Sequence, residues 1–140
     1  MYDDIRSLIQ LDIDAIEAYD QAIDKVDTPS VRSKLIDFKG DHQTHIDKLS
    51  EYLLGKGEEV PDMSPDIKGS LMEGFTSMRS STGTDGALKA MKSNEKATNK
   101  KYEKATGWAL DAQARDIVLQ NYNDEKKHLA YIEEQLSVKA

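Results

Sequence analysis

One arrangement of polar residues occurs twice in this chain, at a constant offset of 83 positions. All three histidines of the chain belong to it, and carboxylates and tyrosines complete it. The first copy comprises Asp12, Tyr19, His42 and His45, and the second comprises Glu95, Tyr102, Glu125 and His128. A duplication of this kind indicates two helical units that carry equivalent side chains at equivalent levels.

The repeated residues have the chemistry of metal ligands, because carboxylate and imidazole donors suit iron, manganese and zinc alike. The last two residues of each copy are three positions apart, which places both on one face of a helix. Two helices that present one carboxylate and one such pair supply half of a dinuclear site in a helical bundle. The sequence therefore predicts a metal site built from Asp12, His42, His45, Glu95, Glu125 and His128.

Several polar neighbours of these residues receive other interpretations. Asp14, Glu17 and Asp41 are close in sequence to the predicted ligands and are alternatives to them, but we expect them to be charges on solvated helix faces. Tyr19 and Tyr102 lie about two helical turns, roughly 10 Å, from the carboxylate of their own helix, so we expect them to pack in the core. Uptake of an oxidising equivalent is a second interpretation of the tyrosines. Without metal, the same side chains can form ion pairs that fix the helix register, and this alternative stays open.

Four long helices must position the repeated residues, since apolar residues recur at alternating steps of three and four in four segments. The pattern predicts one domain over residues 1–140, with a hairpin at 3–56, a crossover at 57–84 and a second hairpin at 85–137. Thr28 and Asp111, which are also 83 residues apart, are predicted to cap the second helix of each hairpin. The repeat is therefore a whole helical hairpin.

The predicted crossover is long for a connection inside a domain. Its length is reasonable if it climbs the full height of the bundle, roughly 35 Å, and inverts the second hairpin. Each repeated carboxylate lies about 16 residues before its hairpin turn, and each i, i+3 pair follows 14 and 17 residues after it, so the six side chains converge on one layer. A short amphipathic helix is predicted to cover the core or, alternatively, to bind a partner, with Ile67, Leu71, Phe75 and Met78 on its apolar face.

Composition narrows the function classes further. Twenty-six acidic against 19 basic residues give a net charge of −7, which disfavours nucleic acid or an anionic membrane as the main partner. The chain has no cysteine, so a metal must be held by oxygen and nitrogen donors. The acidic first residues lack a signal-peptide pattern, and no apolar run approaches the ~18 residues of a membrane span. We expect a cytoplasmic protein, and a homodimer is one possible oligomeric state.

The quoted pattern resembles the ferritin-like carboxylate-bridged dimetal proteins, and is most similar to their small uncharacterised bacterial members. That family places glutamates on helices one and three and Glu-x-x-His on helices two and four. Asp12 and His42 stand here at two of the glutamate positions, and His42 is expected to be a terminal nitrogen donor in place of a bridging carboxylate. The resemblance implies an all-α, ferritin-like four-helix bundle with one long crossover. It also implies two divalent metal ions, with iron expected first and manganese or zinc as alternatives.

Two functions follow from this resemblance. The first is a dinuclear iron or manganese protein that acts as an oxidase, a ferroxidase or a peroxide scavenger. The second is non-enzymatic: a metal-stabilised or metal-free bundle that binds a partner or senses metal. A hydrolase is disfavoured, because the sequence offers no serine or cysteine nucleophile with a placed histidine beside it and no glycine-rich phosphate loop.

Overall fold

Five helices form the computed structural model, which describes residues 1–66, 69 and 71–138. The four long helices are α1 (Tyr2–Lys25), α2 (Pro29–Gly55), α4 (Gly83–Ala105) and α5 (Ala112–Val138). The short helix α3 (Met72–Ser80) lies in the connection between α2 and α4, and the described residues contain no β-strand. This confirms the predicted helical bundle with one crossover that carries a short helix. The second hairpin begins at Gly83, slightly before the expected position.

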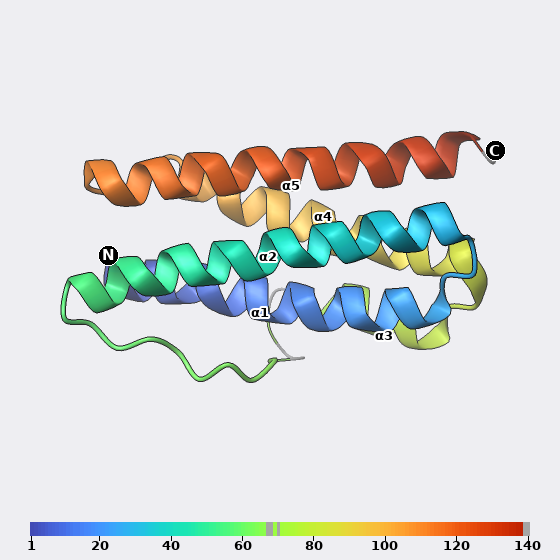
Figure 1. The fold of residues 1–140 in the computed structure, drawn as a ribbon, viewed down its shortest axis with the longest axis horizontal. Coiled ribbons are helices and arrows are strands. Elements are labelled where there is room, and N and C mark those ends of the chain that lie inside the picture. The colour runs from blue at the N-terminus through green and yellow to red at the C-terminus, as the bar shows by residue number, and fades with distance from the viewer. Residues whose placement is uncertain (67–68, 70, 139–140) are drawn as a thin grey trace.

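The two hairpins run in opposite directions along the bundle. In Figure 1 the α1–α2 turn and the α4–α5 turn lie at opposite ends, and the crossover returns along the length of the molecule. Helices α1 and α4 are in contact, as are α2 and α5, so each hairpin packs against the other through both of its helices. Residues near the middle of all four helices therefore reach the same level.

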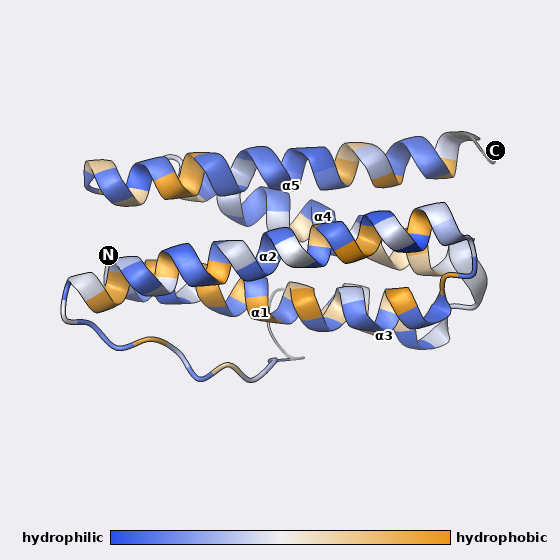
Figure 2. Ribbon diagram, in the orientation of Figure 1, coloured by the Kyte–Doolittle hydropathy of each residue, from blue (hydrophilic) through white to orange (hydrophobic). Residues whose placement is uncertain are grey.

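Burial of apolar side chains along each helix holds the bundle together. Ile5 and Leu8 of α1, Leu35 and Leu49 of α2 and Leu88 of α4 are all fully buried. Burying one such side chain contributes about 1.5–3 kcal/mol relative to leaving it exposed. Figure 2 shows hydrophilic and hydrophobic residues along every long helix, as expected for helices with one buried face. Within the described part of the chain, no helix has an apolar stretch long enough to cross a bilayer.

The two predicted N-caps have different outcomes. Asp111 Oδ1 accepts a hydrogen bond from the Ala114 backbone N–H at 2.9 Å, so this cap is confirmed. Thr28 stands at the N-cap position of α2, but its side chain makes no capping hydrogen bond. Its hydroxyl instead lies 3.3 Å from the hydroxyl of Thr84, at the start of α4. The prediction that Thr28 is the N-cap residue of α2 is therefore confirmed, but its hydroxyl contacts the other hairpin and does not cap the helix.

Helix α3 covers the core, as one of the two interpretations of the crossover predicted. Leu71, Phe75 and Met78 are buried, which leaves no apolar face of these residues for a partner, while Ile67 lies outside the described residues. The approach to α4 is close at Gly74, where an added Cβ would stand 1.5 Å from Asn94 Oδ1. Position 74 therefore has room for hydrogen alone.

Candidate metal centre

The structure brings together all six side chains that the repeat singled out. Asp12 comes from α1, His42 and His45 from α2, Glu95 from α4, and Glu125 and His128 from α5. Each of them has at most 1 % of its surface exposed. Charged groups at this depth are costly unless they are paired or bind a metal. The predicted convergence in one layer of the bundle is thus observed, and it occurs where solvent is almost excluded.

The six residues divide into two overlapping groups, each with four potential ligand atoms within 4.8 Å of one another. We call the first the Asp12 group, which consists of Asp12, His42, His45 and Glu125. We call the second the Glu95 group, which consists of His42, Glu95, Glu125 and His128. His42 and Glu125 belong to both groups. Two neighbouring groups of potential ligand atoms thus share two residues.

Short hydrogen bonds already connect the Asp12 group. Asp12 Oδ1 accepts from His42 Nδ1 at 2.7 Å and from His45 Nδ1 at 3.0 Å. Glu125 Oε1 is slightly farther away, 3.3 Å from His42 Nδ1 and 3.5 Å from His45 Nδ1. The Nδ1 atoms of both rings thus face the same two carboxylates.

The Glu95 group is more open. Glu95 Oε1 lies 3.5 Å from His42 Nε2, and Glu95 Oε2 lies 3.5 Å from His128 Nδ1. Glu125 Oε2 is 3.7 Å from the same His128 nitrogen. Two donors that bind one ion at about 2.1 Å, with an angle of 90–110° between them, stand roughly 3.0–3.4 Å apart. These spacings are therefore close to those of atoms that share an ion and too long for good hydrogen bonds.

Several of the donor atoms lack a hydrogen-bond partner. Among the described residues, seven buried side-chain nitrogen or oxygen atoms are unpartnered, and four of them belong to this cluster. They are His42 Nε2, Glu95 Oε2, Glu125 Oε1 and His128 Nδ1. An unsatisfied buried polar group costs about 1–3 kcal/mol. Bound cations would give all four a close partner, whereas within the protein alone their contacts with oppositely charged side chains are 3.3 Å or longer.

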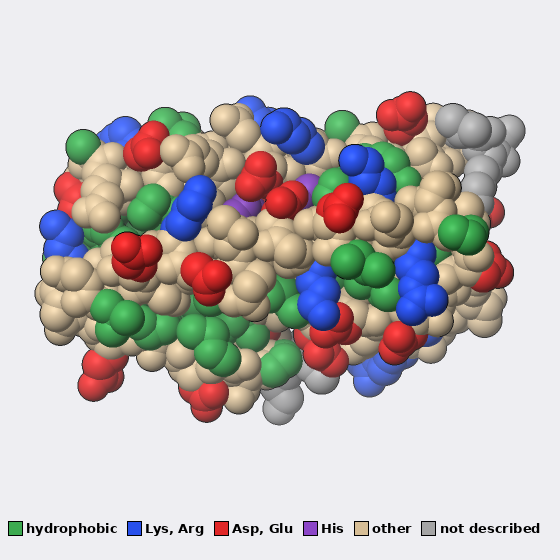
Figure 3. All heavy atoms as spheres, in the orientation of Figure 1, with side chains coloured by type: hydrophobic (Ala, Val, Ile, Leu, Met, Phe, Trp, Pro, Cys, Tyr) green, Lys and Arg blue, Asp and Glu red, His purple; other side chains and the backbone are tan. Residues whose placement is uncertain are grey.

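Two aspartates orient the outer nitrogen atoms of the histidines. His45 Nε2 donates to Asp124 Oδ2 at 2.9 Å, and His128 Nε2 donates to Asp41 Oδ2 at 2.8 Å. Figure 3 shows histidine at the seam between α2 and α5, with acidic side chains beside it. Asp41 was expected to be a solvated charge, and 44 % of its side chain is exposed, but it also accepts this hydrogen bond from His128. Asp124 was missed. Both obey the 83-residue offset, which is the signal that could have found them.

The tyrosines hold carboxylates of the opposite hairpin. Tyr19 donates to Glu95 Oε1 at 3.0 Å, and Tyr102 donates to Asp12 Oδ2 at 2.6 Å. Both rings are fully buried, which confirms that they pack in the core. The sequence did not predict these hydrogen bonds, because each tyrosine is far from the carboxylate of its own helix and bonds to the carboxylate of the neighbouring antiparallel helix. Thr98 adds a hydrogen bond to Glu125 Oε2 at 3.0 Å.

Comparison with known families places the chain. The model of a family described as a domain of unknown function, DUF2383, matches residues 1–107, which is more than half of the sequence. The chain belongs to the DUF2383 family. The matched range of this DUF2383 protein contains α1 to α4, while Glu125 and His128 lie beyond it on α5. Searches of curated proteins and of solved structures find no match.

The electrostatics of the cluster in this DUF2383 protein favour protonated histidines. Burial would lower their pKa values, but the surrounding carboxylates outweigh it and raise the pKa to about 10 for His42, about 9 for His45 and about 12 for His128. For Glu125, burial and the neighbouring charge of Glu95 raise the pKa to about 7. Burial would also raise the pKa of Glu95, but His128 and His42 outweigh it and lower that pKa below its usual value. A cation that binds here must displace protons from the imidazoles.

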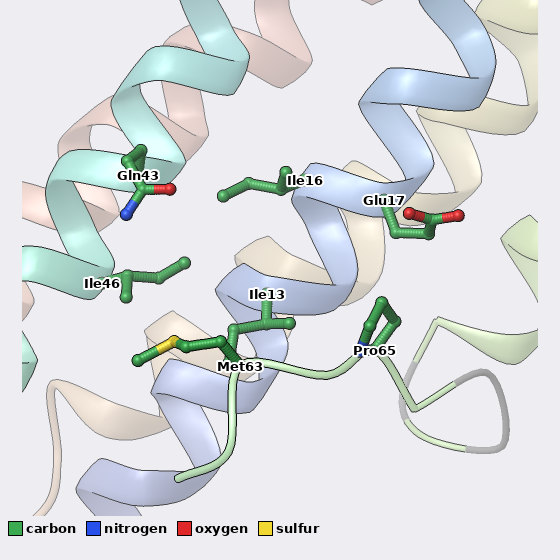
Figure 4. Close-up of a pocket in the computed structure, with 7 residues that line it drawn as sticks. All are labelled: Ile13, Ile16, Glu17, Gln43, Ile46, Met63 and Pro65. Carbon is green, nitrogen blue, oxygen red and sulfur yellow. The ribbon is translucent and has the colours of Figure 1, made fainter. Parts of the chain in front are cut away.

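The remaining polar neighbours lie outside the cluster. Asp14 was expected to be solvated but is buried, because the crossover folds over it and the Asp66 backbone N–H donates to Asp14 Oδ1 at 2.7 Å. Glu17 is half-buried and lines a pocket of about 300 Å³. Figure 4 shows this pocket between α1, α2 and the crossover, where Met63 lies beside Ile13 and Ile46 and Pro65 lies near Glu17. None of the six clustered residues lines it.

Proposed function

We propose that this DUF2383 protein is a ferritin-like metalloprotein whose six clustered residues bind two divalent metal ions, iron or manganese. Its activity would be redox chemistry with dioxygen or peroxide, or oxidation of ferrous iron as substrate. The observation that carries the proposal is the set of four unpartnered donor atoms in the buried cluster. In a purely structural polar layer, nearly every buried polar atom should have a partner.

The donor set fits such ions, since three carboxylates and three imidazoles provide oxygen and nitrogen donors without thiolates. Iron or manganese held there would supply the electrons for reduction of dioxygen or peroxide. Asp41 and Asp124 keep the Nε2 atoms of their histidines occupied, so that Nδ1 points into the cluster. Such outer hydrogen bonds fix the tautomer and the ring orientation of a ligand histidine.

The other residues of the cluster would limit access and movement. Tyr19 and Tyr102 each hold one oxygen of a carboxylate, which restrains Glu95 and Asp12. Because the six side chains are almost completely buried, bulk water is kept away from any reactive species formed among them. The partly exposed Asp41 and Asp124 at the α2–α5 seam give a polar connection from this layer to solvent.

Metal content and oxygen consumption test the proposal together. Protein from cells supplied with iron and manganese should contain about two metal ions per chain, and both Glu125→Ala and His128→Ala should lose them. Glu134→Ala is a matched control, because it removes an exposed glutamate from the same helix. Added ferrous iron should cause rapid oxygen uptake in the wild-type protein and in the control. Uptake no faster than in buffer would exclude the redox function, and absence of metal would exclude the site.

A non-enzymatic bundle is the second candidate, and the bonding of Asp12 favours it. This carboxylate accepts hydrogen bonds from His42, His45 and Tyr102, so it is satisfied without a metal. A layer of ion pairs could then set the helix register, and the protein would serve as a structural or partner-binding bundle. In that case we expect one zinc ion per chain or none, and if no metal is bound the parent protein should unfold at the same temperature before and after chelator treatment.

A further inference from the structure

We propose that His42 bridges the two metal ions, with Nδ1 bound to the ion of the Asp12 group and Nε2 bound to the ion of the Glu95 group. This inference rests on the proposed function, because it requires both ions. It replaces the expectation from sequence that His42 is a terminal donor.

The contacts of its two nitrogen atoms distinguish His42 from the other histidines. Nδ1 faces Asp12 Oδ1 at 2.7 Å and Glu125 Oε1 at 3.3 Å, both in the Asp12 group. Nε2 faces Glu95 Oε1 at 3.5 Å, in the Glu95 group, and has no hydrogen-bond partner. In His45 and His128, by contrast, an aspartate outside the cluster occupies Nε2. His42 alone of the three histidines thus presents both nitrogen atoms to potential metal ligands.

The repeat supports the same assignment. Glu125 is the counterpart of His42 at the 83-residue offset, and it also presents one donor atom to each group. Its Oε1 lies 3.3 Å from His42 Nδ1, whereas its Oε2 lies 3.7 Å from His128 Nδ1. The two central positions of the repeat are therefore occupied by residues with two donor atoms that point in different directions. A bridge made by one of them has a structural equivalent in the other.

The surroundings of the ring hold this orientation. His42 is fully buried, and its ring centroid lies 5.4 Å from that of Tyr19, 5.3 Å from that of His45 and 5.1 Å from that of His128. Interiors packed in this way leave little room for a ring to turn. The hydrogen bond from Nδ1 to Asp12 fixes which edge faces the Asp12 group, so Nε2 necessarily faces the Glu95 group.

A bridging ring has a measurable consequence, which is the distance between the ions. With metal–nitrogen bonds of about 2.1 Å on opposite sides of the ring, the ions stand roughly 6 Å apart. The two metal ions of phosphatases, polymerases and aminopeptidases are about 3.5–4 Å apart. Both ring hydrogens of His42 leave to solvent as the two metal–nitrogen bonds form. The inference therefore predicts two ions that are linked through a ring and are more widely separated than in those enzymes.

Anomalous scattering from crystals of the manganese-loaded protein measures this distance directly. We expect two peaks about 6 Å apart, with His42 between them. His42→Glu should reduce the separation to about 3.5–4 Å, because a carboxylate then replaces the ring. Two peaks already 3.5–4 Å apart in the wild-type protein, or a ring that contacts one ion of the pair, would overturn the bridge and leave the two-metal proposal intact. A single peak would overturn both.

Electron paramagnetic resonance of the copper(II)-loaded protein gives an independent readout in solution. An imidazolate bridge couples two copper ions magnetically, so the wild-type spectrum should have lower intensity than two isolated ions give. His42→Asn keeps one donor atom at this position and removes the second, and its spectrum should recover the full intensity for the copper bound. Copper content is measured on the same samples. Equal intensity per copper ion in wild type and variant would count against the bridge.

Discussion

Asp41→Asn and Asp124→Asn test how strongly metal affinity depends on the outer hydrogen bonds of the histidines. Each asparagine keeps the size of the aspartate but removes the charge that His128 Nε2 or His45 Nε2 contacts at 2.8 and 2.9 Å. Loss of such a partner typically weakens metal binding 10- to 100-fold, or about 1.4–2.7 kcal/mol. Because 44 % of the Asp41 side chain and 36 % of the Asp124 side chain are exposed, we expect values near the lower limit.

Competition with a fluorescent chelator for manganese or zinc measures these affinities. The two aspartates act on different histidines in different groups, so the losses in the double variant should add as free energies. Asp116→Asn on α5 serves as the control, since Asp116 is exposed and accepts a hydrogen bond from Gln120 on the same helix. If the double variant bound metal as tightly as this control, the role assigned to the outer hydrogen bonds would be wrong.

Three further predictions concern stability, measured by urea or thermal unfolding. Gly40→Ala should stabilise the protein by about 0.5–1 kcal/mol, because Gly40 lies within α2 and no atom is near the position of the added Cβ. Gly74→Ala should destabilise the protein, because the added Cβ would clash with Asn94 of α4. Tyr102→Phe should cost about 1–3 kcal/mol, because Asp12 Oδ2 loses its donor. In chelator-treated protein, the histidine pKa values of about 10, 9 and 12 exceed the unfolded value of 6.5. The free energy of folding that the protonated histidines contribute is therefore complete below pH 6.5 and is lost as the pH rises towards 9–12. The urea concentration at the unfolding midpoint should be lower at pH 9 than at pH 6.5, and a higher midpoint at pH 9 would contradict this assignment.

Helical periodicity predicted most of the fold because each helix has one continuous buried face. Steps of three and four residues identify that face, and the equal spacing in both hairpins predicts a common level for the polar residues. The side chain of Thr28 could not be predicted in this way, since its hydroxyl contacts Thr84 of the other hairpin. Gly74 likewise gains its significance from Asn94, which lies on a different helix. Contacts between distant segments are the part that local pattern does not encode.

The same holds for the candidate site: the repeat predicted its inner residues, but not the contacts that they make with distant segments. The repeat identified the inner side chains, but the burial of Asp14 depends on the path of the crossover, which has no counterpart in the repeat. Tyr19 and Tyr102 were placed in the core correctly, yet their hydrogen bonds reach across the bundle to Glu95 and Asp12. Asp124 was missed although it repeats Asp41 at the 83-residue offset.

The repeat also allows a prediction about the order of metal binding, because the two groups differ where the duplicated residues differ. Asp12, which is one methylene shorter than Glu95, accepts hydrogen bonds from His42, His45 and Tyr102. Three donor atoms that face the Glu95 group have no hydrogen-bond partner, namely His42 Nε2, Glu95 Oε2 and His128 Nδ1.

An ion that enters the Glu95 group therefore displaces fewer hydrogen bonds within the protein than one that enters the Asp12 group, so we expect the Glu95 group to fill first. At less than one manganese ion per chain, His128→Ala should then abolish binding, whereas His45→Ala should leave the affinity for this first ion nearly unchanged. If His45→Ala abolished binding of the first ion and His128→Ala did not, the unpartnered donor atoms would not determine the order of binding. The first ion would then bind in the Asp12 group, where the side chains are already in contact.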